Sequence, residues 1–483
     1  MHYRIIAKTV AILQMIIAGF HILCGVLALS FHENSSALAF FSSGALLVFG
    51  CTIVLFWLRD IKPQTLSTKD GFVLVTASWV GAVLAGALPY YISGSIPAFT
   101  DALFETVSGF STTGASILTD IEALPKSILF WRSLTHWLGG MGIVVMAVAI
   151  LPLLGIGGMQ LISAEAPGPT VDKITPRITE TAKYLWYIYI FFTIAETAML
   201  CFGGMTFFDA LNHTFATLAT GGFSTKNTSI KYFDSAYIDY VIAFFMIMAG
   251  INFSLHFKLM TGRFKSVFID TELKFYLSFI AIATFIIMMS LHGTVYSTYA
   301  SSFRYAIFQV SSFITCTGFA TDDYEKWPYL AQTVLFLLMF IGACSGSTGG
   351  GIKVIRIATL LKQGLNEMKY LVHPRGIFVL RINGQPVKKN IVYAISGFFF
   401  LYITMVLVVT LIVTSSGADI VTALSSALTT AGGIGPGFGM IGPTENFAFF
   451  PDYVKLTLCA SMLLGRLEIY TALVIFTPIF WRK

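Results

Sequence analysis

The sequence predicts an all-α polytopic membrane protein with four internal repeats and an additional N-terminal two-helix hairpin. Apolar residues make up 56% of the 483 residues and charged residues only 11%, whereas a soluble domain has about 25% charged residues. Seven stretches of at least 24 residues contain no Asp, Glu, Lys or Arg, and a turn rich in Thr and Gly recurs four times. This composition excludes a cytosolic enzyme, a disordered chain and a nucleic-acid-binding protein.

The charge-free stretches are the first candidates for membrane spans, because about 20 apolar residues cross the hydrocarbon core as a helix. They lie at 9–32, 34–58, 71–100, 133–164, 275–303, 327–352 and 390–418. Three further spans, which are shorter or contain a charge, are expected at 184–204, 240–257 and 453–476. Ten spans place both termini on the same side of the membrane.

The distribution of Lys and Arg decides which side that is. Of the 30 basic residues, 22 fall on the same side as the N-terminus, seven on the other side, and Arg466 within a span. Because cytoplasmic segments carry the excess of Lys and Arg, both termini are expected inside. The segment 353–389 holds eight of them, which fits a docking surface for a partner or for anionic lipid, or the orientation bias alone.

Four apolar segments are too short to cross the membrane, at about 101–111, 208–219, 304–315 and 419–429. Each is expected to form a half-helix of roughly 16 Å. Each leads into a turn that ends in glycine, at positions 114, 222, 318 and 432, and then into a span that contains Gly140, Gly250, Gly342 or Gly465. The expected repeats, each a span, half-helix, turn and span, are 61–165, 166–265, 266–370 and 371–483, and residues 1–60 form the hairpin.

The turns suggest a chemistry for the repeat. Four turns around one axis present rings of backbone carbonyls, which can replace the water around a dehydrated monovalent cation. Glycine permits the necessary backbone conformation. The alternative, glycines that only let helices pack closely, accounts for one or two turns and not for four. The candidate site residues are Thr112, Thr113, Gly114, Thr220, Gly221, Gly222, Cys316, Thr317, Gly318, Thr430, Ala431 and Gly432.

At these residues the chain resembles the Trk/Ktr/HKT superfamily of potassium-uptake subunits, and its TrkH branch in particular. The matching segments are STTGAS (111–116), ATGGFS (219–224), TCTGFATDDY (315–324), TTAGGIGPGFG (429–439), GACSGSTGGGIK (342–353) and LLGRLE (463–468). The resemblance covers residues 60–483, and the N-terminal pair of spans fits the TrkH branch. It implies four M1–P–M2 units around a K⁺-channel-like pore. The sodium-selective HKT branch has Ser where this chain has Gly114, so the glycine favours potassium.

The resemblance further implies potassium uptake across the bacterial inner membrane by a homodimer. A cytosolic, NAD- or ATP-binding subunit of the TrkA type would gate it, so no cofactor is expected in this chain. The alternative is a K⁺/H⁺ or K⁺/Na⁺ symporter with the same filter, and the intramembrane Glu196 and Glu468 leave proton coupling open. An enzyme is not expected, because the sequence shows no pattern of nucleophile and base or of metal ligands.

The segment 342–356 interrupts a span with five glycines. It is not a phosphate-binding loop, because Ile352 stands where that motif requires Lys. A broken helix at membrane depth must line a cavity. The resemblance implies an intramembrane gate below the filter, formed by Gly346, Ser347, Thr348, Gly349, Gly350, Gly351 and Arg466.

Arg466 is a charge inside a span, which is costly and usually functional. We expect it to face the pore and repel cations. The alternative is a structural ion pair with Glu468 or Glu196, although positions i and i+2 do not share a helix face.

Overall fold

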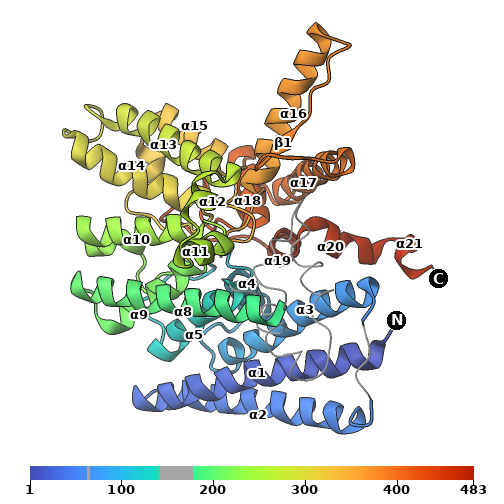
Figure 1. Cartoon of the computed structure of the whole chain (residues 1–483). Coiled ribbons are helices and arrows are strands. Elements are labelled where there is room, and N and C mark those ends of the chain that lie inside the picture. Colours follow the sequence, from blue (N-terminus) through green and yellow to red (C-terminus); the bar gives the residue numbers. More distant parts are fainter. Residues whose placement is uncertain (62–65, 141–177, 483) are drawn as a thin grey trace.

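A computed structural model describes residues 1–61, 66–140 and 178–482, which are mostly helical and contain one two-stranded sheet (Figure 1). Helices α1 (Tyr3–Ser30) and α2 (Asn34–Trp57) form the expected N-terminal hairpin and pack against α3 (Thr68–Ile92). The start of α3 is set by a capping box, in which the Ser67 hydroxyl accepts the Asp70 N–H and the Asp70 carboxylate accepts the Ser67 N–H.

Four units with the same order of helices follow along the chain. Each has a long helix of 21 to 26 residues, a short helix of 12 to 16 residues and a third helix of 10 to 15 residues. The long helices are α3, α8 (Ile178–Phe202), α13 (Thr271–Leu291) and α17 (Lys389–Thr414). The short helices are α4 (Phe99–Phe110), α9 (Phe207–Leu218), α14 (Tyr299–Ile314) and α18 (Ile420–Gly432). The third helices are α5 (Lys126–Gly140), α10 (Ala236–Ala249), α15 (Tyr329–Leu338) and α19 (Asp452–Arg466).

The described residues contain six helices that are long and apolar enough to cross a membrane, or up to eight if two bent pairs each count as one span. Three of the ten expected spans, those at 240–257, 327–352 and 453–476, are interrupted in the structure. Helix α10 meets α11 (Phe253–Met260) at 97°, and α19 meets the segment Ile469–Phe476, which begins with α20 (Ile469–Leu473), at 113°. Fifteen residues separate α15 from α16 (Val354–Val372). The span expected at 133–164 is described only as far as Gly140, and its remainder lies outside the described residues.

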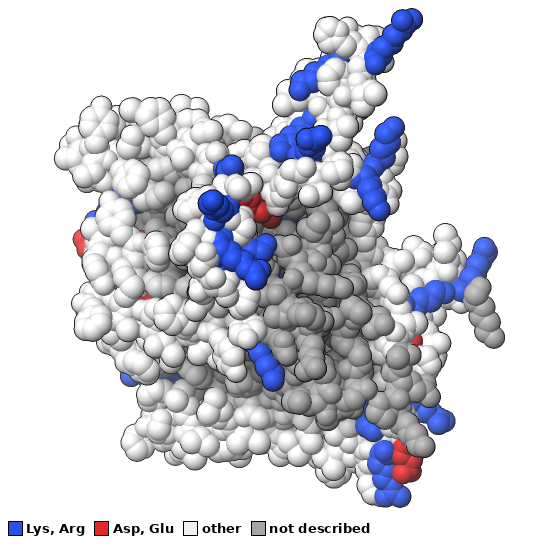
Figure 2. Space-filling view, viewed as in Figure 1, with Lys and Arg blue, Asp and Glu red and all other residues white. Residues whose placement is uncertain are grey.

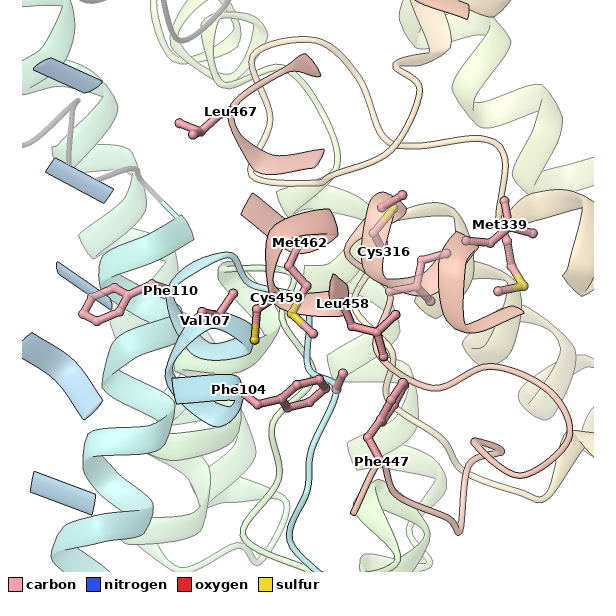
Figure 3. Close-up of a cluster of buried hydrophobic side chains, with 14 of the residues drawn as sticks. Phe104, Val107, Phe110, Cys316, Met339, Phe447, Leu458, Cys459, Met462 and Leu467 are labelled. Carbon is pink, nitrogen blue, oxygen red and sulfur yellow. The ribbon is translucent and has the colours of Figure 1, made fainter. Parts of the chain in front are cut away.

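The helices that end the units pack against the short helices of other units. Helix α5 contacts α9, α10 contacts α14, and α19 contacts α4. Figure 3 shows the last of these contacts, where Leu458 and Met462 of α19 lie beside Phe104 and Val107 of α4. This contact brings the C-terminal unit against the first one, so the units close on themselves.

A helical arm formed by α16 and the strands β1 (Arg381–Ile382) and β2 (Gln385–Pro386) projects from one side of the molecule (Figure 1). Lys and Arg side chains lie along it in Figure 2. Lys369 of α16 and Arg375, between α16 and β1, are exposed. The remaining elements are short connections: α12 (Phe264–Phe268), η2 (Ser229–Phe233), η3 (Tyr324–Lys326), η4 (Val474–Phe476) and α21 (Pro478–Trp481).

Candidate functional site

The segments after the first three short helices share one backbone conformation. We name them turn 1 (111–114), turn 2 (219–222) and turn 3 (315–318). The second residue of each has a φ of 54 to 61° and the last a φ of 76 to 82°. The left-handed non-glycine residues are Thr112, Thr220 and Cys316, and the glycines are Gly114, Gly222 and Gly318. A non-glycine residue in this region costs roughly 1–2 kcal/mol, so packing around the turns must enforce it.

The fourth turn lies three residues later than the expected position. Helix α18 continues through Gly432, and Gly433 and Gly435 have the positive φ values, 72 and 94°. The N–H of Ile434 donates to the carbonyl of Thr429 across 2.9 Å, as the N–H of Thr113 donates to Ser108. Turn 4 is therefore 432–435. Thr430, Ala431 and Gly432 match the other turns by residue type, but they form the last turn of α18, which ends at Gly433 in the left-handed conformation.

The last residue of each turn is a glycine with a positive φ, and these four glycines place each turn against the next one. A Cβ atom on Gly114 would overlap the carbonyl oxygen of Gly221 in turn 2, and one on Gly222 would overlap that of Thr317 in turn 3. Turn 3 meets turn 4 in the same way, because a Cβ atom on Gly318 would overlap the carbonyl oxygen of Ile434.

The last contact closes the ring. A Cβ atom on Gly435 would lie 2.7 Å from the carbonyl oxygen of Thr113 in turn 1. The turns therefore follow one another in the cyclic order 1, 2, 3, 4, with a backbone carbonyl against each glycine. Only a residue without a side chain fits at these four contacts, and the same contacts bring together carbonyls from four separate parts of the chain.

The register of turn 4 can be tested by a pair of alanine substitutions. Gly435→Ala should impair transport strongly, because its Cβ atom would meet the Thr113 carbonyl from a backbone with φ of 94°. Gly432→Ala should be tolerated, since its Cβ atom comes no closer than 3.4 Å to any atom. The measurement is ion flux through purified variants in liposomes. Equal loss of flux in both variants, or loss of flux in Gly432→Ala alone, would indicate that the fourth turn is 429–432, as the sequence predicts.

The glycine-rich segment between α15 and α16, which we call the loop (339–353), lies against the ends of turns 3 and 4. A Cβ atom on Gly350 would overlap the carbonyl oxygen of Gly432, and one on Gly349 would lie 2.9 Å from that of Thr315. Of the six loop residues expected to form a gate together with Arg466, Gly349, Gly350 and Gly351 lie next to turns 3 and 4, whereas Gly346 lies beside Asn252 and Thr348 bonds the Ala249 carbonyl, both at the break between α10 and α11.

The loop finds its backbone partners where α10 and α11 separate. The N–H of Cys344 donates to the carbonyl of Gly250, and the N–H of Phe253 donates to that of Gly346, both across 3.0 Å. These bonds satisfy groups that the break in the helix leaves open, as a buried broken span requires.

The carboxylate of Glu272, which was not among the expected site residues, joins the loop to the start of α16. Glu272 Oε1 accepts the N–H of Ser345 at 2.7 Å and that of Ile355 at 3.1 Å. Glu272 is buried at the start of α13. An acid beside an expected span was the only available signal, and its partners lie 73 and 83 residues away.

Arg466 reaches across the loop to the first unit. Its guanidinium donates to the carbonyl of Thr348 at 2.9 Å, to that of Gly139 at 2.5 Å and to that of Gly140 at 3.2 Å. Glu468, considered as its ion-pair partner, forms an ion pair with Arg356. Arg466 therefore links the loop to α5 through backbone carbonyls.

Acidic residues after the turns tie the connecting segments together. The Asp120 carboxylate accepts a hydrogen bond from the Asn227 side chain at 2.9 Å, and Glu325 accepts the Gly439 N–H at 2.6 Å. Asp322 accepts one from Lys231 at 3.0 Å and another from the Tyr296 hydroxyl. Burial acts to raise its pKa, but these hydrogen bonds hold the pKa of Asp322 below its ordinary value. These acids are therefore held in place by hydrogen bonds within the segments that follow the turns. Within the described ranges, no three His, Cys, Asp or Glu side chains gather to hold a metal.

The comparisons with known proteins agree with this architecture. A family model described as TrkH, a cation transport protein, matches residues 36–483. The chain is 41% identical to the Trk system potassium uptake protein TrkH of Salmonella typhimurium, with all of both chains covered. It is 36% identical to the Trk system potassium uptake protein TrkG of Escherichia coli, with 92% of this chain and 93% of that one covered.

A solved structure extends the likeness to three dimensions. The crystal structure of the potassium transporter TrkH from Vibrio parahaemolyticus matches with a TM-score of 0.88 and 37% identity, over 100% of both chains. These relatives are transporters, in agreement with the expectation that the chain is not an enzyme. The match covers the helices, the turns and the loop alike, and the chain belongs to the TrkH family of cation transport proteins.

Proposed function

We propose that this chain carries K⁺ into the cell through a channel-like pore whose selectivity filter is the ring of turns 1 to 4. The observation that carries the proposal is the closed ring itself, in which four glycines bring backbone carbonyls of all four turns together. Carbonyl dipoles can replace the hydration shell of a permeating monovalent cation. The short helices α4, α9, α14 and α18 end at the turns, so the partial negative charge at their C-termini favours a cation there.

The test is ion flux through the purified chain in liposomes, with K⁺ and Na⁺ compared. We expect K⁺ flux well above Na⁺ flux, with a reversal potential set by the K⁺ gradient alone. A reversal potential that shifts with an imposed H⁺ or Na⁺ gradient would contradict a passive pore and identify the K⁺/H⁺ or K⁺/Na⁺ symporter. Equal K⁺ and Na⁺ flux would contradict the filter.

The loop is proposed as the gate of this pore, with Arg466 as the residue that holds it. Support comes from its position against turns 3 and 4 and from its glycine content, which permits more than one backbone conformation at small cost. The positive charge of Arg466, joined to the Thr348 carbonyl, also disfavours a cation next to the loop.

The relatives are named as parts of a Trk system, which implies partner proteins. We propose a homodimer in the bacterial inner membrane, with both termini in the cytoplasm, regulated by a nucleotide-binding subunit of the TrkA type. The charge asymmetry along the chain supports this orientation. The basic arm formed by α16, β1 and β2 offers that subunit a surface, and it continues directly from the loop.

A further inference from the structure

A buried ion pair lies behind turn 1. Arg132 Nε of α5 is 2.5 Å from Glu105 Oε1 of α4, and the two side chains are 2% and 0% exposed. Arg132, directly before the span expected at 133–164, is one of the seven basic residues expected outside the membrane, and in the structure it is enclosed between helices. Removing two charges from water is costly, and such a pair is weak evidence for stability alone. The contacts of Glu105 and Arg132 with the segments that follow turns 1 and 2 indicate another role.

The carboxylate of the pair holds the segment that leaves turn 1. Glu105 accepts hydrogen bonds from the Ser116 hydroxyl at 3.0 and 3.1 Å and from the Ile117 N–H at 3.1 Å. Ser116 follows Gly114 by two residues. The position of the first turn is thus coupled to the carboxylate.

The guanidinium of the pair holds the segment that leaves turn 2. Arg132 donates to the carbonyl of Ser224 at 2.9 Å, and its guanidinium lies 3.6 Å from the centre of the Phe223 ring. Phe223 and Ser224 directly follow Gly222. The ion pair is therefore a continuous link between turn 1 and turn 2.

Among the described residues, no other unit has an acid–arginine pair at the two equivalent positions. Glu105 lies three residues before Ser108, whose carbonyl accepts the Thr113 N–H. Three residues before the equivalent acceptor carbonyls of the other units stand His213, Gln309 and Ser426. His213 bonds the Ser224 hydroxyl at 2.9 Å and Gln309 the Phe319 carbonyl at 3.3 Å, each within its own unit. Counted from the span glycines, the position of Arg132 is occupied by Ile242, Val334 and Thr457.

We propose that Glu105 and Arg132 are positioning residues for ion selectivity, which fix the separation of turns 1 and 2. The proposal rests on the ring being the selectivity filter. A ring discriminates between K⁺ and Na⁺ through the number and arrangement of its carbonyls, and the pair ties two neighbouring turns through rigid, planar groups. If the link loosens, the two turns adapt to the smaller ion, and the K⁺/Na⁺ flux ratio falls.

The main variant is Arg132→Lys, which keeps the buried charge but cannot reproduce the forked contact to Glu105 and Ser224. We expect normal insertion and a K⁺/Na⁺ flux ratio lowered roughly threefold or more, the effect of losing about one hydrogen bond. The double variant Glu105→Gln/Arg132→Gln removes both charges at once, so it leaves no unpaired charge, and its ratio should also fall.

The matched control is a partly buried acid–arginine pair away from the turns. Arg304 of α14 and Asp239 of α10 are 2.7 Å apart and 17% and 3% exposed. Arg304 lies ten residues before the end of α14, roughly 15 Å from turn 3. Arg304→Lys should keep the parental flux ratio.

Each possible outcome of these measurements either supports or contradicts the proposed role of the pair. If the parent is selective and a folded Arg132→Lys or double variant has the same ratio, the pair is only structural and the proposal fails. The same holds if Arg304→Lys lowers the ratio equally. If neither Arg132 variant inserts, the pair is required for folding and the proposal fails as well. A parent without selectivity contradicts the proposed filter itself, whatever the variants do.

Discussion

Gly114→Ser is expected to lower the K⁺/Na⁺ flux ratio by at least roughly tenfold, a change of about 1.4 kcal/mol in relative free energy. The Cβ atom of serine would overlap the Gly221 carbonyl oxygen, so that carbonyl must leave the ring or turn 1 must move. The backbone φ of 80° adds strain. The measurement is K⁺ and Na⁺ flux through purified protein in liposomes.

Gly94→Ser serves as the matched control for this substitution. Gly94 belongs to the same unit and has a φ of 72°, but its Cβ atom would meet nothing within 4 Å. It therefore carries similar backbone strain without the overlap, and its flux ratio should equal that of the parent. A well-folded Gly114→Ser protein with an unchanged ratio would remove Gly114 from the filter.

Deletion of 346–350 is expected to raise basal K⁺ flux roughly tenfold or more, which corresponds to about 1.4 kcal/mol. The deletion removes the segment next to turns 3 and 4 together with Thr348, the loop residue that Arg466 holds. Both N–H groups bound by Glu272, that of Ser345 in the loop and that of Ile355 in α16, remain. Flux with and without the regulatory subunit should be measured, and stimulation should shrink as basal flux rises.

Arg466→Ala tests the same element without shortening the chain. It removes the hydrogen bonds to Thr348, Gly139 and Gly140, so flux should rise while the K⁺/Na⁺ ratio stays that of the parent. A deletion variant that conducts like the parent and is still fully stimulated would show that the gate lies elsewhere. A folded Arg466→Ala protein with reduced flux would assign that residue a structural role.

The sequence by itself determined the features that depend on local composition. Charge-free stretches predicted five of the six long apolar helices in the described residues, because about 20 apolar residues are needed to cross the hydrocarbon core as a helix. Apolar segments too short to cross the membrane predicted the four short helices, and the glycines that end turns 1 to 3 predicted the last left-handed position of each. The family resemblance also followed from these residues, and the comparisons confirm it.

Tertiary structure alone decided the features that depend on distant partners. Turn 4 begins at Gly432 rather than at Thr429, because two later glycines allowed α18 to extend and Gly435 to meet Thr113. The break between α10 and α11 exists because the loop supplies its missing hydrogen bonds.

The buried charges illustrate the same limit. From its position between a turn and an expected span, Arg132 is predicted to lie in a loop. Its partners in the structure are Glu105, 27 residues earlier, and Ser224, 92 residues later. Residue type and local spacing carry no information about such pairs, since the free energy that places a charge in the interior comes from groups that only the folded chain brings together.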